Sequence, residues 1–97
     1  MIRSFRDRRT EQVFAGKTPK GFPSDLIGVA RRKLRMIDAA AELDDLRAPP
    51  GNRLESLQHD LRGRRSIRIN DQFRVCFVWS GGDAFEVEII DYLEDRT

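Results

Sequence analysis

Arginines gather in the second half of the chain at positions where they could bind phosphate. A basic loop carries Arg62, Arg64 and Arg65, and an alternating segment after it carries Arg68 and Arg74. Guanidinium groups match phosphate oxygens bidentately and stay charged at any working pH. The pattern therefore predicts a phosphate-binding surface, and a surface of this kind suits RNA.

The alternative is a solvated surface in which Arg68 and Arg74 form ion pairs with Glu86, Glu88 or Glu94. Two cations that face each other across a hairpin repel, so this arrangement is easier to explain when an anion normally lies between them. Both interpretations stay open on the residues alone.

Two further side chains are candidates for chemistry. His59, the single histidine, lies in the loop beside the arginines, and its ordinary pKa of about 6.5 suits proton transfer, although a lone loop histidine is often incidental. Tyr92 could stack on a base or donate its hydroxyl to a phosphate, or it could simply pack at the edge of a sheet. One histidine and one cysteine, Cys76, make no metal-ligand set, so neither metal nor cofactor is expected.

Apolar and polar residues alternate on both sides of residues 70–72, which predicts a β-hairpin that positions Arg68 and Arg74. A three-residue turn at Asn70–Gln72 places Arg68 opposite Arg74. A loop at Gly81–Asp83 then predicts a further set of facing pairs: Phe85 with Trp79, Val87 with Phe77, Ile89 with Val75, and Ile90 with Arg74. A short strand within residues 51–57 precedes the basic loop.

The first half of the chain has helical periodicity. Residues 2–5 form a candidate strand, and a helix of two turns begins at Asp7 or Thr10 and ends at Gly16. Ser24 is expected to cap a longer helix that ends before Pro49. Its apolar stripe comprises Leu26, Ala30, Leu34, Ile37 and Ala41, and its basic run comprises Arg31, Arg32, Lys33 and Arg35, which suits a solvated face or a contact with nucleic acid.

The predicted fold class is α+β, in one domain over residues 1–97, with element order β-α-α-β-β-β. The N-terminal strand and two helices would pack on one face of a mostly antiparallel sheet. The opposite face is expected to stay open and to carry Arg68, Arg74, Cys76, Ile90 and Tyr92.

Charge and composition narrow the partners. The net charge is only +2, but basic residues dominate positions 1–35 and 51–74, whereas acids gather at 38–45 and from 83 onward. Such a segregated basic surface suits an acidic partner segment. No apolar run approaches the roughly 18 residues that span a membrane, and the N-terminus has no signal-peptide core, so a cytoplasmic protein without a membrane partner is expected.

Three segments carry a resemblance to a known family. They are Pro50–Leu57 (PGNRLESL), Ser66–Phe77 (SIRINDQFRVCF) and Val87–Tyr92 (VEIIDY), and the opening residues 1–5 agree with them. Together they resemble the HigB group of the RelE/ParE toxin superfamily, the toxins of type II toxin-antitoxin modules. The resemblance runs from residue 1 to about residue 92.

The resemblance implies a ribosome-dependent mRNA endonuclease that acts on mRNA in the ribosomal A site. It also implies a HigA-like helix-turn-helix antitoxin as partner, with operator DNA bound only through the complex. On this basis Arg74, supported by Arg68, would hold the scissile phosphate, and Tyr92 would orient or stack the nucleotide. His59 or Asp91 would transfer protons, and Arg62, Arg64 and Arg65 would bind the RNA backbone.

Two alternatives of other classes remain. The same superfamily fold serves in ParE-like poisons of DNA gyrase, which have no nuclease activity. An inactive relative could also act only as a corepressor with its antitoxin. Loss of toxicity on substitution of Arg74 would favour the nuclease over the gyrase poison.

The chain departs from the family at one position. The family commonly ends this motif with Asp-Tyr-His, whereas this chain has Asp91, Tyr92 and Leu93. The missing histidine predicts slow RNA cleavage, because one proton-transfer group is absent. Leu93→His is therefore expected to raise the rate of RNA cleavage in a cell-free translation reaction, and an unchanged rate would count against a catalytic deficit at this position.

Overall fold

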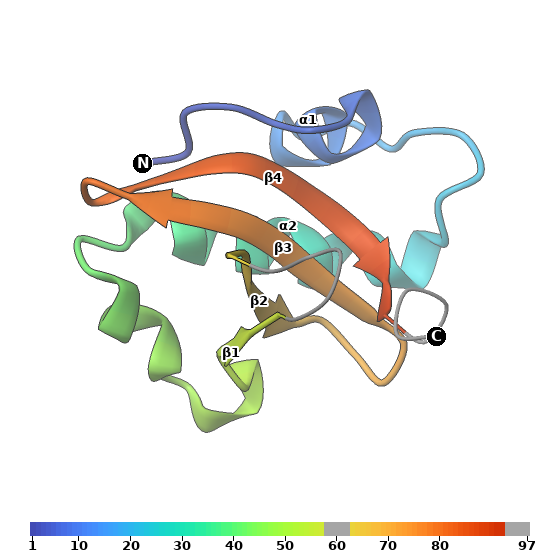
Figure 1. The fold of residues 1–97 in the computed structure, drawn as a ribbon. Helices are drawn as coiled ribbons and strands as arrows, with labels where there is room; N and C mark the ends of the chain where they lie inside the picture. The colour runs from blue at the N-terminus through green and yellow to red at the C-terminus, as the bar shows by residue number, and fades with distance from the viewer. Residues whose placement is uncertain (58–62, 93–97) are drawn as a thin grey trace.

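Four antiparallel strands form the sheet of this protein. The computed structural model describes residues 1–57 and 63–92. The strands lie side by side in chain order (Figure 1): β1 (Glu55–Ser56), β2 (Arg65–Arg68), β3 (Phe73–Ser80) and β4 (Asp83–Asp91). The predicted α+β class is confirmed.

The N-terminal segment runs along the free edge of β4. Ile2 bridges Ala84 and Phe5 bridges Val87, both in parallel orientation. The amide of Arg3 donates to the Ala84 carbonyl at 2.8 Å. The predicted strand over residues 2–5 therefore forms two isolated bridges rather than a continuous strand, and the sheet is antiparallel except at this edge.

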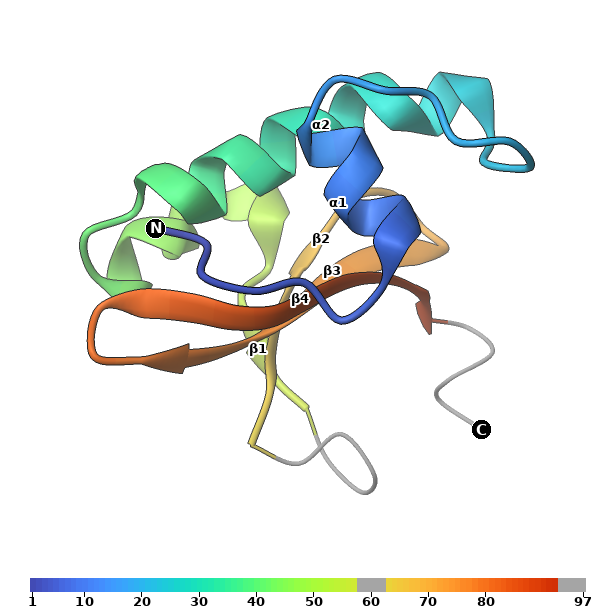
Figure 2. The same cartoon turned by 90° about the horizontal axis from the view of Figure 1, so that it is seen from above.

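Two α-helices cover one face of the sheet (Figure 2). Helix α1 (Arg8–Phe14) begins after Asp7 and ends just before Gly16, whose φ of +93° favours glycine. Helix α2 (Ser24–Ala39) has Pro23 at its N-cap position, so Ser24 is the first helical residue and not the predicted cap. Two short 3-10 helices follow, η1 (Leu43–Arg47) and η2 (Pro50–Asn52).

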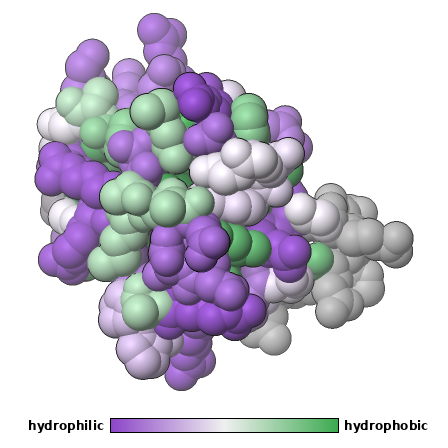
Figure 3. All heavy atoms as spheres, turned by 90° about the vertical axis from the view of Figure 1, so that its left-hand side faces the viewer, coloured by the Kyte–Doolittle hydropathy of each residue, from purple (hydrophilic) through white to green (hydrophobic). Residues whose placement is uncertain are grey.

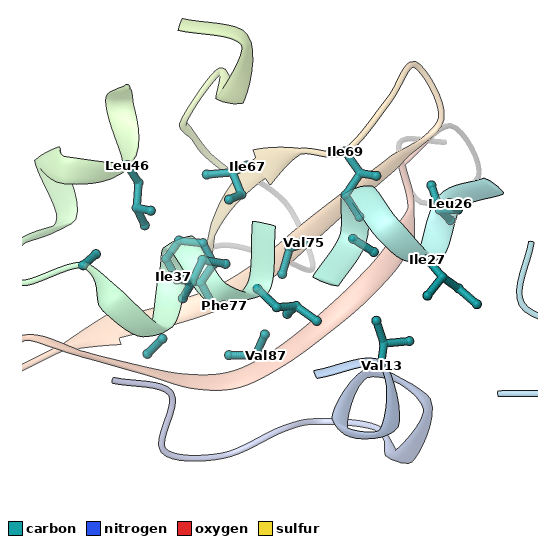
Figure 4. Packing of buried hydrophobic residues seen from close by; sticks show 14 residues of the cluster. Val13, Leu26, Ile27, Ile37, Leu46, Ile67, Ile69, Val75, Phe77 and Val87 are labelled. Carbon is teal, nitrogen blue, oxygen red and sulfur yellow. The ribbon is translucent and has the colours of Figure 1, made fainter. Parts of the chain in front are cut away.

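The main core lies between α2 and the sheet (Figure 4). Leu26, Ala30, Leu34 and Ile37 of the predicted stripe are buried, whereas Ala41 is exposed. Helix α2 ends at Ala39, so the helical period no longer applies at residue 41. The strands contribute alternate residues to this core: Ile67, Ile69, Val75, Phe77 and Val87.

The register of β3 and β4 follows the prediction at one end only. Val75 pairs with Ile89 and Arg74 with Ile90, as predicted, but Trp79 pairs with Ala84 and not with Phe85. The connection is a two-residue turn, because Gly81 and Gly82 both have positive φ, which a hairpin turn of this length requires.

A β-bulge on β4 absorbs the difference of one residue. The register shifts between Cys76 and Val78, so that Glu86 and Val87 both oppose Phe77. Glu86 has a φ of +51°, the left-handed conformation found in many bulges. The predicted pairs of Phe85 with Trp79 and of Val87 with Phe77 assumed a regular ladder and are corrected by this bulge.

A buried asparagine fixes the chain just before β1. Asn52 is fully buried, and its Nδ2 donates to the carbonyls of Leu46 at 3.2 Å and Ala48 at 3.3 Å. Lys33 of α2 donates to its Oδ1. Asn52 therefore joins η1, η2 and α2, and holds residue 53 at a defined place beside the sheet.

The face of the molecule in Figure 3 offers little continuous apolar area. In the side view of Figure 3, hydrophobic atoms form small groups interrupted by hydrophilic ones. Within residues 1–57 and 63–92, the large apolar side chain that stays mostly exposed is Met1. None of the helices in this part of the chain is long and apolar enough to cross a membrane.

The role of Asn52 predicts a loss of stability. Asn52→Ala is expected to lower the free energy of unfolding by about 2–3 kcal/mol, because buried carbonyls lose their donors. Denaturant unfolding measures this change, with Arg47→Ala, an exposed site, expected within about 0.5 kcal/mol of wild type. An unchanged midpoint for Asn52→Ala would contradict this role.

Candidate functional site

The sheet face opposite the helices is more covered than predicted. Leu57, Cys76 and Ile90 form a small buried cluster, and Tyr92 packs against it. Arg74 is only 4% exposed. The prediction of an open face is therefore wrong for Arg74, Cys76 and Ile90, because Leu57 after β1 packs on this face.

Beside this cluster lies a pocket of about 180 Å³. It is lined by residues from the segment before β1, from β1 to β3, from the β2–β3 turn and from the end of β4: Arg53, Glu55, Arg68, Asn70, Asp71, Arg74 and Tyr92. Three arginines, two carboxylates and one tyrosine thus surround one hollow. Of the predicted site residues, the pocket collects Arg68, Arg74 and Tyr92.

Arg74 is the buried wall of the pocket. Its Nε donates to Ser66 Oγ at 2.7 Å, and its Nη2 donates to the carbonyls of Arg53 and Ser66. Its Nη1 lies 3.5 Å from Glu55 Oε1. The guanidinium carbon lies 5.2 Å from the centre of the Tyr92 ring, within range of a cation–π interaction.

The electrostatics of Arg74 follow from this cage. Burial lowers the pKa of Arg74, while the neighbouring Glu55 and Tyr92 oppose the shift. Arginine stays protonated in proteins, so the pocket keeps a buried positive charge. Among the described residues, Glu55 is the acid that forms an ion pair with Arg74, whereas Glu86 and Glu88 pair with Arg64. Glu94, the third acid weighed in the sequence, lies outside the described residues.

Arg68 lies opposite Arg74 in the ladder, as predicted, but in a different environment. Its side chain is 32% exposed and forms an ion pair with Asp71, whose side chain is 99% exposed. The pKa of Lys33 on α2 is lowered, first by its partial burial and then by the positive charges of Arg32 and Arg68. Repulsion between the facing arginines is thus relieved by separate acids, Glu55 for Arg74 and Asp71 for Arg68.

The β2–β3 turn holds the backbone of Tyr92 in place. The amide of Tyr92 donates to the Gln72 carbonyl at 2.7 Å. The Gln72 side-chain amide donates to Asp91 Oδ2 at 2.8 Å, so Asp91 contacts the β2–β3 turn and is not among the residues that line the pocket. The turn itself is closed by Asn70, whose Oδ1 accepts from the amides of Gln72 and Phe73.

The predicted basic loop is divided. Arg64 is 6% exposed; its Nη2 donates to the Glu86 carbonyl, and its Nη1 lies 3.6 Å from Glu86 Oε2. Arg65 donates to Ser56 Oγ. Neither lines the pocket, and the guanidinium of Arg64 is bound by Glu86 at the bulge. The predicted contact of Arg64 and Arg65 with RNA stays a prediction. Arg62 and His59 lie outside the described residues.

Sequence reasoning did not select four of the pocket residues as site residues: Arg53, Glu55, Asn70 and Asp71. A signal existed for Glu55, which pairs with Ser66 in the ladder, so that it shares a face with the neighbours of Arg74. Residue parity along β1 would have found it. Across the described positions, no group of three acidic, histidine or cysteine side chains could hold a metal ion.

Comparison with known sequences assigns the chain to a family. The sequence pattern of the family described as "RelE-like toxin of type II toxin-antitoxin system HigB" matches residues 3–95. Toxin HigB-1 of Vibrio cholerae is 42% identical over 85 residues, which cover 87% of this chain and 90% of that protein. Endoribonuclease HigB of Proteus vulgaris is 28% identical over 92 residues, covering 95% and 99%.

An uncharacterized protein of Haemophilus influenzae is 40% identical over 80 residues, which cover 81% of this chain and 79% of that protein. The match of the family pattern and the identity to Toxin HigB-1 each extend over most of the chain. The resemblance noted in the sequence is thereby confirmed. The chain belongs to the HigB family of RelE-like toxins of type II toxin-antitoxin systems.

Proposed function

We propose that this toxin is a ribosome-dependent endoribonuclease that cuts mRNA in the A site without a metal ion. The observation that carries the proposal is the pocket in which Arg53, Arg68 and Arg74 surround a hollow with Glu55 and Tyr92. The relative from Proteus vulgaris named Endoribonuclease HigB supports an RNA substrate.

The pocket contains cations and a carboxylate, two of the kinds of group that RNA cleavage needs. Attack by the ribose 2′-oxygen on the adjacent phosphorus forms a 2′,3′-cyclic phosphate and breaks the bond to the 5′-oxygen. A base takes the 2′-hydroxyl proton, an acid protonates the leaving 5′-oxygen, and cations stabilise the charge on the phosphate. Arg68 and the buried charge of Arg74 serve the last of these purposes.

Glu55 is the best-placed proton acceptor in the described pocket. Its carboxylate is partly exposed at 41%, and it lies 3.5 Å from the guanidinium of Arg74, which orients it. An ionised carboxylate accepts a proton from a hydroxyl held within hydrogen-bond distance. Asp91 contacts Gln72 instead, and His59 stays a predicted candidate for proton transfer.

Tyr92 suits contact with the nucleotide. One face of its ring already receives the Arg74 guanidinium, and the residue lines the pocket. Unpaired RNA bases are commonly bound by stacking on aromatic rings. Tyr92 would thus position the base while the arginines hold the phosphate.

A type II toxin has an antitoxin partner, and we propose a HigA-like helix-turn-helix protein in this role. The complex would bind operator DNA through the antitoxin and repress its own operon. Both toxin and antitoxin would act in the cytoplasm, where the ribosome is the site of cleavage.

The role of Glu55 gives the first test of the mechanism. Glu55→Gln is expected to slow cleavage by about 10² to 10⁴-fold, because the amide cannot accept the 2′-hydroxyl proton. The measurement is primer extension on a defined message in cell-free translation, with and without ribosomes. Glu11→Gln, an exposed site on α1, serves as the matched control and should cut like wild type.

Two results would overturn these proposals separately. Normal cleavage by Glu55→Gln would exclude Glu55 as the base and leave the endonuclease intact. Intact message with wild-type toxin, together with blocked DNA supercoiling in a parallel assay, would instead favour a gyrase poison.

Stacking by Tyr92 gives a second test. Tyr92→Ala is expected to raise the half-saturating toxin concentration on programmed ribosomes about 5- to 150-fold, since stacking contributes about 1–3 kcal/mol per base. Tyr92→Phe keeps the ring and should stay within about twofold of wild type. Equal loss in both variants would show that the hydroxyl, and not stacking, is what the RNA needs.

A further inference from the structure

We propose that Arg53 is a direct ligand of an RNA phosphate in the pocket, and that Arg74 is the positioning residue that holds Arg53 in place. This inference rests on the proposed function and deepens it. Arg53 belongs to the segment that carries the family resemblance but was not among the predicted site residues; it lies in a stretch without periodicity between η2 and β1.

The backbone of Arg53 is held in an uncommon conformation. Its φ of 45° and ψ of 60° lie in the left-handed region, which residues other than glycine, asparagine and aspartate rarely adopt. Its amide donates to the Pro50 carbonyl at 3.1 Å, and its carbonyl accepts from Arg74 Nη2. Such conformations persist where the surroundings determine them, and they cluster at functional sites.

The side chain of Arg53 is available to a ligand. It is exposed and lines the pocket together with Arg68. Among the residues that the structure describes, no hydrogen bond or ion pair engages its guanidinium group. A guanidinium fork in this position can bind two phosphate oxygens at once.

Arg74 is poorly placed for the same task. Its Nε and Nη2 donate to Ser66 and to the Arg53 carbonyl, its Nη1 faces Glu55, and its side chain is 5% exposed. A phosphate would have to displace these internal partners to bind it bidentately. Arg53 and Arg68 are therefore the direct contacts, and Arg74 fixes the backbone from which Arg53 projects.

The test is single-turnover cleavage of a defined message on programmed ribosomes at several salt concentrations. Arg53→Asn removes the charge, and asparagine tolerates the left-handed backbone. We expect its half-saturating concentration to rise at least fivefold, and its salt dependence to weaken by about one counterion. Arg53→Lys should recover part of the affinity, and Arg47→Asn, outside the pocket, should match wild type.

Positioning by Arg74 has its own signature. In an Arg74→Lys background, Arg53→Asn is expected to cause little additional loss, because Arg53 is already misplaced and the two effects are not additive. Fully additive effects would show that Arg74 does not act through Arg53.

The possible failures can be told apart. If wild type cuts the message and Arg53→Asn has unchanged affinity and salt dependence, Arg53 is no phosphate ligand and the proposed function stands. If wild type cuts no message on ribosomes, the proposed function fails and this inference fails with it.

Discussion

The buried guanidinium of Arg74 is the interaction on which the rest of the site depends. A charge removed from water is costly unless it is paired and hydrogen-bonded. Four separate parts of the chain compensate this charge: Ser66 on β2, the carbonyl of Arg53 before β1, Glu55 on β1 and the ring of Tyr92 after β4. The contacts that compensate the charge of Arg74 therefore fix the relative positions of most segments that line the pocket.

The two faces of the sheet divide the tasks of stability and chemistry. The helix side is apolar and includes most of the large buried side chains, such as Leu34, Ile37 and Phe77. Within residues 1–57 and 63–92, the buried apolar residues of the opposite face form the small cluster of Leu57, Cys76 and Ile90. Because the first face supplies most of the hydrophobic stabilisation, the second can accommodate buried polar groups that lower stability.

Periodicity predicted the parts of the fold that repeat. The helical period predicted the buried stripe on α2. The period of two in the strands predicted the turn at Asn70–Gln72 and the pairing of Arg68 with Arg74. The bulge at Glu86 interrupts the period and could not be predicted by parity. The Glu86 carbonyl accepts a hydrogen bond from Arg64. The burial of Arg64 therefore could not be predicted either, because Arg64 and its neighbour Arg65 are the same residue type.

The site residues that the sequence analysis found lie where strands are long. Arg74 and Tyr92 lie on or next to the extended hairpin, so their proximity followed from register. Arg53 precedes a strand of two residues, and its position depends on the buried Asn52 and on a bond from Arg74. Such tertiary contacts leave no pattern in the local sequence. The family resemblance identified the segment, but the geometry identified the residue.

The two acids of the pocket differ in how easily a phosphate can replace them. Asp71 is 99% exposed, and an exposed ion pair with Arg68 contributes only about 0–1 kcal/mol, so an RNA phosphate can displace it at little cost. Glu55 faces a guanidinium that is 5% exposed, and removing this partner would leave a buried charge uncompensated. On the proposed mechanism, the RNA phosphate therefore displaces Asp71 from Arg68, whereas Glu55 stays beside Arg74 and accepts the proton.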